Sequence, residues 1–258
     1  IGLQAMIDPP REEVRESIKK CRSAGISTVV ITGDHKLTAI AITKELGIFK
    51  EGDKALSGEE LDKLSDDELD EIVESVVICA RVSPEHKVRI LSALKKRGHV
   101  VAMTGDGVND APALKRSDIG IAMGITGTDV AKEASDMVLT DDNFASIVNA
   151  VEEGRGIYNT IKQFVQYTLS SNFGEILVIF LAILIGWPLP LIAIQILWVN
   201  LLTDGLPGLA LGMDPFDKDI MNKPPRKRDE EIMSKEVIYN ILIVGSVMAA
   251  GTLFMFYG

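Results

Sequence analysis

The first 141 residues alternate short apolar runs with amphipathic segments. The apolar runs contain many β-branched residues, which favour strands, and they occupy 27–34, 76–82, 99–106, 119–124 and 136–142. Between them, apolar positions at helical spacing predict helices at 10–24, 36–46, 84–97 and 128–134. Strands that alternate with helices in this way predict an α/β domain, with a parallel sheet covered by helices on both faces.

From Asp142 onward the pattern changes. No proline interrupts the chain between Asp142 and Ile185, and the sequence passes from polar to strongly apolar. A continuous helix over this stretch would be roughly 65 Å long, about twice the thickness of a bilayer core. We therefore expect a stalk helix at 142–164, spans at 165–185, 190–211 and 237–258, and a polar loop at 212–236.

The charges of that loop predict its side of the membrane. Lys223, Arg226, Lys227 and Arg228 lie close together in it, and loops rich in Lys and Arg stay in the cytosol. Two spans separate this loop from the sheet domain, so the sheet domain is predicted to be cytosolic too. The alternative is a buried helix of a large soluble protein, but three apolar stretches of bilayer length favour lipid as the surrounding partner.

Composition narrows the possible partners and compartment. The chain has 37 acidic residues against 27 basic ones, which argues against nucleic acid as a partner. Residues 51–74 hold much of the acid and are interpreted as a solvated loop and helix. Cys21 and Cys79 have neither disulfide nor metal spacing, so they are predicted to be reduced, buried thiols. Because the sequence starts at Ile1 and stops inside an apolar run, we expect a piece of a longer protein.

Polar groups collect where two predicted strands end. The runs at 27–34 and 99–106 both finish in Thr-Gly-Asp, and in parallel sheets the carboxyl ends of strands form the site. The second run continues as "MTGDGVNDAP", with Asp106 and Asp110 four positions apart in a glycine-rich loop. Taken alone, this loop fits a magnesium site, a calcium loop or a plain turn.

The longer stretch "TGDGVNDAPALK" (104–115) resembles the hinge motif of the P-type cation-transporting ATPases. Further stretches match this family in the expected order: "DPPREEV" (8–14), "ITGD" (31–34), "ARVSPEHK" (80–87), "SNFGE" (171–175) and "WVNLLTDGLP" (198–207). The membrane stretches resemble the calcium-pump branch, of the sarcoplasmic reticulum type. The resemblance implies a haloacid-dehalogenase-like, Rossmann-like phosphorylation domain, joined by a stalk helix to an α-helical transmembrane bundle.

Phosphoryl transfer explains the residues of the hinge loop. Mg²⁺ prefers carboxylate oxygens and retains several waters, so Asp106 is the predicted ligand, with Asp110 supporting the metal or its waters. The Asn109 amide can donate to phosphate, and Gly105 and Gly107 allow the backbone to approach it. The resemblance implies the same roles.

Other assignments rest on the resemblance alone. It implies that Lys87 neutralises phosphoryl charge, that Thr32 and the Gly33 amide contact phosphate beside Asp34, and that Arg81 contacts the nucleotide, ATP. His86 is interpreted as structural.

The motif that carries the family's phosphorylated aspartate, Asp-Lys-Thr-Gly-Thr, does not occur here, and Asp217-Lys218-Asp219 lacks its glycine. We therefore expect this chain alone to be inactive and to depend on the nucleotide-binding domain, actuator domain and other spans of its parent.

Polar residues inside the predicted spans indicate a second site. A charge at mid-bilayer costs about 2.5–3.5 kcal/mol on insertion scales, so acids there need partners. Helical spacing puts Asn172 and Glu175 on one face of the first span, and Asn200, Thr203 and Asp204 on one face of the second. Gly205 and Pro207 are expected to break that second helix and free carbonyl groups.

Hard oxygen ligands such as these suit Ca²⁺, although Thr203 can equally serve an interhelical hydrogen bond. The sequence therefore predicts part of an ATP-driven calcium pump, in a prokaryotic plasma membrane or a eukaryotic internal membrane. The alternatives are a sodium or proton pump, a membrane-anchored phosphatase and a non-catalytic scaffold.

Overall fold

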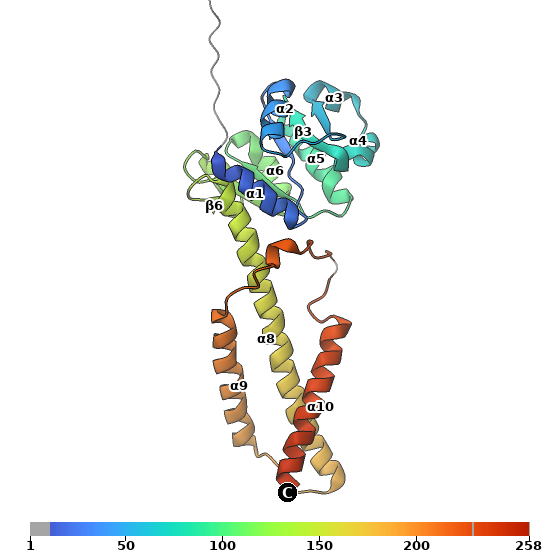
Figure 1. The fold of residues 1–258 in the computed structure, drawn as a ribbon, viewed down its shortest axis with the longest axis vertical. Coiled ribbons are helices and arrows are strands. Elements are labelled where there is room, and N and C mark those ends of the chain that lie inside the picture. Colours follow the sequence, from blue (N-terminus) through green and yellow to red (C-terminus); the bar gives the residue numbers. More distant parts are fainter. Residues whose placement is uncertain (1–10, 229, 258) are drawn as a thin grey trace, which may run out of the picture. The chain divides into compact units, whose positions relative to one another are not determined.

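The computed structural model describes residues 11–228 and 230–257 (Figure 1). The beginning of the 8–14 stretch and residue 10 of the first predicted helix lie outside the described residues. These described residues form two compact units: 11–151 with 221–228, and 152–220 with 230–257.

The first unit alternates strands and helices, as the hydrophobic pattern predicts. Its elements are α1 (Glu12–Ser23), β1 (Val30–Thr32), α2 (Lys36–Glu45), β2 (Lys54–Ser57), α3 (Gly58–Lys63), α4 (Asp66–Ile72), β3 (Val76–Ala80), α5 (Pro84–Lys96), β4 (Ala102–Gly105), α6 (Ala111–Arg116), β5 (Ile119–Met123), α7 (Asp129–Glu133) and β6 (Met137–Leu139). Each predicted apolar run contains one of these strands. Strand β2 and helix α6 are additional, while α3 and α4 lie in the acidic stretch 51–74 that the sequence indicates as a loop and a helix. All four elements are too short to produce a clear periodicity.

All strand pairs in the described residues are parallel, which confirms the predicted sheet type, but they form two sheets rather than one. The first has the order β1-β3-β2 and the second β4-β5-β6. Thr32 pairs with Ala80, and Thr104 pairs with Ile121. Strands β1 and β4, which carry the two Thr-Gly-Asp sequences, are therefore both edge strands.

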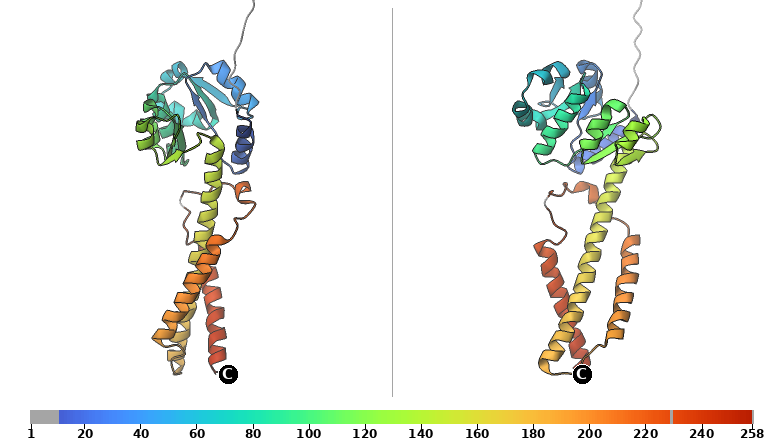
Figure 2. Two further views of the ribbon diagram at one scale, coloured as in Figure 1. Left: turned by 90° about the vertical axis from the view of Figure 1, so that its left-hand side faces the viewer. Right: turned by 180° about the vertical axis from the view of Figure 1, so that it is seen from behind.

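Helices pack on both faces of the strands (Figure 2). In the first sheet, α2 covers Ile78 and Ala80 on one face, and α3, α4 and α5 cover the other through a cluster around Cys79. In the second sheet, α6 and α7 pack around Ala122, while the opposite face packs against the beginning of the long helix α8 through Ile147. The prediction of a two-faced α/β domain is confirmed.

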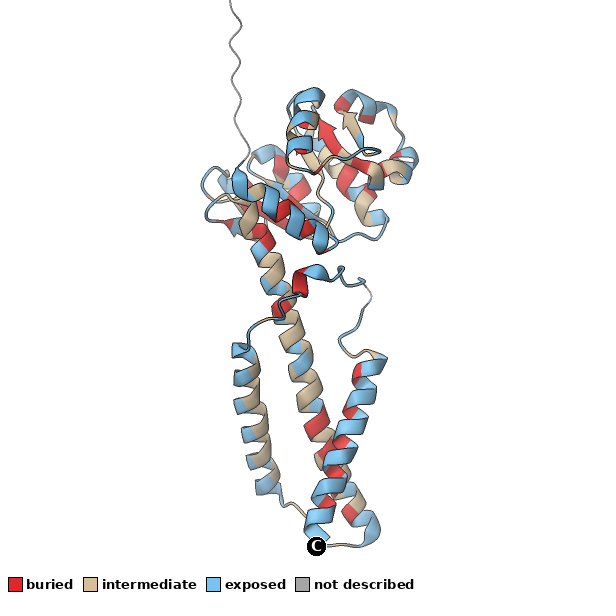
Figure 3. Ribbon diagram, in the orientation of Figure 1, coloured by how far each residue is buried: buried red, intermediate tan, exposed pale blue. Residues whose placement is uncertain are grey.

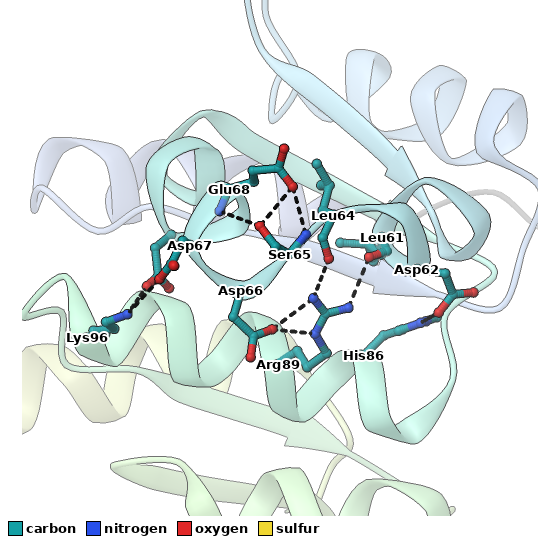
Figure 4. Close-up of polar contacts among 11 residues, drawn as sticks. Leu61, Asp62, Leu64, Ser65, Asp66, Asp67, Glu68, His86, Arg89 and Lys96 are labelled. Atoms are coloured by element: carbon teal, nitrogen blue, oxygen red, sulfur yellow. Dashed lines mark hydrogen bonds and ion pairs between the residues drawn. The ribbon is translucent and has the colours of Figure 1, made fainter.

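The acidic segment 58–74 is more than a solvated surface. Leu61, Leu69 and Val73 are buried against α5, while acidic side chains of the same segment meet bases on α5 (Figure 4). Arg89 forms an ion pair with Asp66 at 2.9 Å, and Lys96 pairs with Asp70. Exposed pairs of this kind each contribute about 0–1 kcal/mol, so the buried leucines supply most of the stability.

The second unit consists of α8 from residue 152 onward, α9 (Ala193–Met213) and α10 (Lys235–Tyr257). Helix α8 runs unbroken from Phe144 to Ile185, which at 1.5 Å per residue is about 63 Å. These three helices are long and apolar enough to cross a membrane.

Small residues allow α8 and α10 to approach closely. A Cβ atom at Gly245 would lie 2.5 Å from the Phe173 ring and 3.0 Å from the Ser170 carbonyl oxygen, so glycine is required there. Further along, Ala182 packs against Ala249 and Leu253. Figure 3 shows buried stretches, in red, along α8 and α10.

Leu61 and Cys79 share one core cluster, and burial raises the pKa of the Cys79 thiol to about 12. Leu61→Ala should lower the free energy of unfolding by about 2–5 kcal/mol, because the cavity it leaves is enclosed. The measurement is the rate at which a thiol reagent labels Cys79 across a urea series, in a Cys21→Ser background.

The matched control is Leu37→Ala, since Leu37 is 71% exposed. Equal labelling midpoints for the two leucine variants would contradict the placement of Leu61 in the core.

Candidate functional site

The loop after β4 is built around the Asp110 carboxylate. Asp110 is buried, and its Oδ2 accepts the backbone N–H groups of Asp106 and Gly107, each at 3.2 Å. The chain turns so tightly that a Cβ at Gly105 would lie 2.4 Å from the Asp110 Cβ. Glycine at 105 is therefore a steric requirement, which agrees with the prediction that the backbone turns sharply there.

Lys87 reaches this loop from the start of α5. The Ser83 hydroxyl caps that helix, and Pro84 occupies its first turn, which together fix where the helix begins. The Lys87 Nζ donates to Asp110 Oδ1, and the two side chains are 20% and 7% exposed. The structure thus brings two predicted site residues together as a largely buried ion pair.

The Asp106 side chain is exposed, whereas hydrogen bonds hold its backbone in place. Its N–H donates to Asp110, and its carbonyl accepts the Thr128 N–H at 2.8 Å. Within the described residues, its carboxylate makes no hydrogen bond or ion pair, so it is available to an ion. Asn109, one turn on, is also exposed.

This arrangement fits Mg²⁺ bound by few protein ligands better than a metal whose ligands all come from the protein. The described residues contain no group of three His, Cys, Asp or Glu side chains that could hold a metal ion. Mg²⁺ usually keeps several waters and takes one or two carboxylates together with substrate phosphates. Asp106 meets that requirement, and Asp110, which is committed to Lys87 and the backbone, fits the supporting role.

The Thr-Gly-Asp sequence after β1 forms a small open turn. The Asp34 N–H donates to Thr32 Oγ1 at 3.1 Å, and Gly33 and Asp34 are exposed. Ile31 packs against both the Cys79 cluster and the cluster around Met103 of β4. The ends of β1 and β4 therefore lie in one region of the unit, as the sheet prediction requires.

Arg81 and His86 follow β3. Arg81 is exposed and has a φ of 52°, an uncommon backbone conformation that often occurs at functional sites. His86 is buried, and its Nδ1 accepts the Ser83 N–H at 3.1 Å, so Nε2 carries the proton toward Asp62 at 2.7 Å. Its contacts are those of a capping and packing residue, as expected.

The predicted polar faces of α8 and α9 meet. With its amide oriented to satisfy both groups, the Asn200 nitrogen donates to both carboxylate oxygens of Glu175, at 2.9 and 3.0 Å. Asp204 lines a cavity of about 360 Å³ together with Thr160. The Asp204 Oδ1 is buried and has no hydrogen-bond partner among the described residues, which is costly unless a cation or proton occupies the site.

Two sequence-based expectations for α9 need correction. The helix is not broken at Gly205 and Pro207 but continues from Ala193 to Met213 with Pro207 inside it. Transmembrane-type helices tolerate proline because neighbouring groups or small backbone adjustments can compensate for the hydrogen bond that proline removes. That loss still leaves the Thr203 carbonyl, four residues earlier, without its helical donor. The Thr203 hydroxyl donates to the Val199 carbonyl at 2.9 Å rather than between helices.

Sequence reasoning missed the backbone support of Asp106. Thr128 holds the Asp106 carbonyl through its N–H and also caps α7 through its hydroxyl. A threonine at a helix start is recognisable from sequence, but its contact with a loop 22 residues earlier is not. Asp62, which bonds His86, was missed for the same reason.

Comparison with known proteins relates both units to one family. Residues 1–118 and, separately, 86–151 match haloacid dehalogenase-like hydrolases, and residues 188–258 match the C-terminus of cation transporting ATPases. A calcium-transporting ATPase of Bacillus cereus is 59% identical across 95% of this chain. The chain belongs to the cation-transporting ATPases.

Further relatives of this ATPase chain come from distant organisms. An endoplasmic reticulum calcium ATPase of Aspergillus fumigatus is 53% identical over 98% of the chain, and a human calcium-transporting ATPase of type 2C is 49% identical over all of it. The chain spans 26–28% of the length of these three relatives. The predicted resemblance to P-type ATPases is confirmed, whereas the roles of single residues remain predictions.

Asp110→Asn should destabilise the first unit by about 1–3 kcal/mol, because it leaves the largely buried Lys87 ammonium without its carboxylate. Asp106→Asn should change stability by less than about 0.5 kcal/mol, since the Asp106 carboxylate has no partner to lose. Both values come from urea unfolding of the ATPase chain followed by Cys79 labelling. A larger loss for Asp106→Asn than for Asp110→Asn would contradict this geometry.

Proposed function

We propose that the parent protein is an ATP-driven calcium pump that works through a phosphorylated aspartate. This chain would supply the C-terminal part of the phosphorylation domain (1–141), the stalk helix (142–164), and spans at 165–185, 190–211 and 237–258 joined by a cytosolic loop (212–236). The observation that carries the proposal is the Glu175–Asn200 contact beside the unpartnered Asp204 oxygen, on two helices apolar enough to cross a membrane.

The first unit would supply some of the residues that phosphoryl transfer needs, although not the phosphorylated aspartate. Asp106 would hold Mg²⁺, which when bound screens the negative charge of the transferring phosphate. Lys87 would add positive charge, with Asp110 fixing its position. Thr32, the Gly33 amide and Asn109 would donate to phosphate oxygens, and Asp34 and Arg81 would line the approach of ATP.

The open edges of the two sheets suggest where a further strand of the parent protein pairs with this unit. Strands β1 and β4 are edge strands among the described residues, and an open edge can pair with a further strand. A parallel strand from the remaining length of the parent, paired at these edges, would end beside Asp106. We assign the phosphorylated aspartate to such a strand.

The second unit has hard oxygen ligands for the transported ion. Ca²⁺ takes six to eight oxygens from carboxylates, amides and carbonyls. Glu175 and Asp204 would contribute carboxylates, while Asn172, Asn200 and Thr203 would contribute neutral oxygens. Other spans of the parent would complete the shell. Two carboxylates and the calcium-transporting relatives favour Ca²⁺ over Na⁺ or H⁺ as the cargo.

Asp106→Asn in the full-length parent should reduce Mg²⁺-dependent phosphorylation from ATP by at least about tenfold, and Lys87→Ala should also slow phosphoryl transfer. The measurement is the rate of ³²P incorporation into the pump in membranes. Equilibrium Ca²⁺ binding to the unphosphorylated pump should survive both changes. Normal rates of incorporation would show that the phosphoryl site lies elsewhere.

Glu175→Gln and Asp204→Asn remove a charge and preserve shape, so each should weaken Ca²⁺ binding by about tenfold or more. Equilibrium ⁴⁵Ca²⁺ binding to the parent in membranes measures this directly. The control is Thr252→Val on α10, a polar position outside the proposed ion site, because the Thr252 hydroxyl donates to the Met248 carbonyl of its own helix.

Unchanged affinity and stoichiometry in both acid variants would refute the ion site. Retained Ca²⁺ binding with altered Na⁺ or proton coupling would instead favour another cargo.

A further inference from the structure

A carboxylate just before α8 holds the loop that follows β5. Asp142 lies two residues ahead of Phe144, where α8 begins. Its Oδ1 accepts the N–H groups of Gly124 (2.6 Å) and Ile125 (3.0 Å), and its Oδ2 accepts both the N–H and the hydroxyl of Thr126, each at 2.8 Å. Four donors from three consecutive residues therefore converge on one side chain.

The backbone and charge of Asp142 fit this role. Its φ is 49°, a left-handed conformation that Asp and Asn adopt more readily than other side chains. Desolvation raises the pKa of its carboxyl, but the hydrogen bonds from residues 124–126 outweigh that effect and hold the pKa at about 2. The carboxylate is therefore charged, and able to accept from all four donors, throughout the physiological pH range.

The loop held by Asp142 packs closely against neighbouring backbone at its two glycines. A Cβ at Gly124 would lie 2.3 Å from the Leu139 carbonyl oxygen, and a Cβ at Gly127 would lie 1.9 Å from that of Met123. The loop ends at Thr128, whose N–H donates to the Asp106 carbonyl at 2.8 Å. A continuous set of short contacts thus connects the residues before α8 with the backbone of Asp106.

Asp106 depends on that contact because its carboxylate has no support of its own. Asp110 holds the N–H of Asp106, and Thr128 holds its carbonyl. We propose that Asp142 is a positioning residue for Asp106: by fixing loop 124–128 it keeps the Thr128 N–H on the Asp106 carbonyl and so aims the Asp106 carboxylate at Mg²⁺. The inference rests on the proposed function, in which Asp106 is the Mg²⁺ ligand.

The neighbouring acid provides a matched control. Asp141 is also a carboxylate just before α8, but it accepts from the Asn143 N–H and the Ser146 hydroxyl and from no group of loop 124–128 among the described residues. Asp142→Asn keeps size and the left-handed backbone preference but replaces one acceptor oxygen with a donor. Asp141→Asn makes the same chemical change without touching the loop.

The experiment titrates Mg²⁺ in the phosphorylation assay of the full-length parent in membranes. Asp142→Asn should raise the Mg²⁺ concentration for half-maximal phosphorylation about tenfold, as losses of groups that orient metal ligands do. Asp141→Asn should change it by less than about twofold. The maximal phosphoenzyme level at saturating Mg²⁺ and the equilibrium Ca²⁺ binding should stay near those of the unaltered pump for both.

A second pair of variants isolates the hydrogen bond itself. Thr128 has a φ of −72°, which proline can adopt, so Thr128→Pro removes the N–H that holds Asp106. Thr128→Ala keeps that N–H and loses only the side-chain cap. Thr128→Pro should raise the Mg²⁺ concentration for half-maximal phosphorylation at least as much as Asp142→Asn does. Thr128→Ala should raise it clearly less.

The outcomes separate this inference from the proposed function. Equal shifts for Asp142→Asn and Asp141→Asn, a shift in neither, or less phosphoenzyme with an unchanged Mg²⁺ midpoint would overturn the positioning role. Equal shifts for the proline and alanine variants would do the same. If Asp106→Asn in the same assay phosphorylates normally with Mg²⁺, the proposed function itself is wrong.

Discussion

The ion pair between Lys87 and Asp110 is the constraint on which the phosphoryl site depends. Asp110 joins α5 to the loop after β4, because one of its oxygens binds the Lys87 ammonium from α5 and the other accepts two N–H groups of that loop. A buried pair of this kind is stable only when its remaining hydrogen-bonding capacity is satisfied, and the loop backbone satisfies it. The same bonds leave Asp106 exposed, with its carboxylate unused.

The sequence predicted the strands and helices of the first unit because they follow simple periodicities. Runs such as 76–82 and 119–124 contain strands, and each long amphipathic segment contains a helix. It missed β2 because Lys54–Ser57 is short and sits in an acidic stretch. It also predicted one sheet where the described residues form two, since strand order depends on contacts distant in sequence.

The site was predictable in its residues but not in their contacts. Motif resemblance located Asp106, Lys87 and Glu175, and spacing placed Asn200 and Asp204 on one helical face. Nothing in the spacing shows that Asp110 pairs with Lys87, that Thr128 donates to the Asp106 carbonyl, or that Asp142 holds residues 124–126. Pro207 shows a related limit: the residue type predicts a lost hydrogen bond, whereas the packing of the helix decides whether the helix breaks.

Asn200 affects how two acidic side chains can lie close together between apolar helices. Its amide nitrogen donates to both oxygens of Glu175, so a neutral side chain offsets part of the charge of that carboxylate. An amide carries donor and acceptor on the same planar group, and a half-turn about one bond exchanges them. In the proposed cycle Asn200 would thus act as a reversible stand-in for the cation, a part that neither a third acid nor a hydroxyl could play as well.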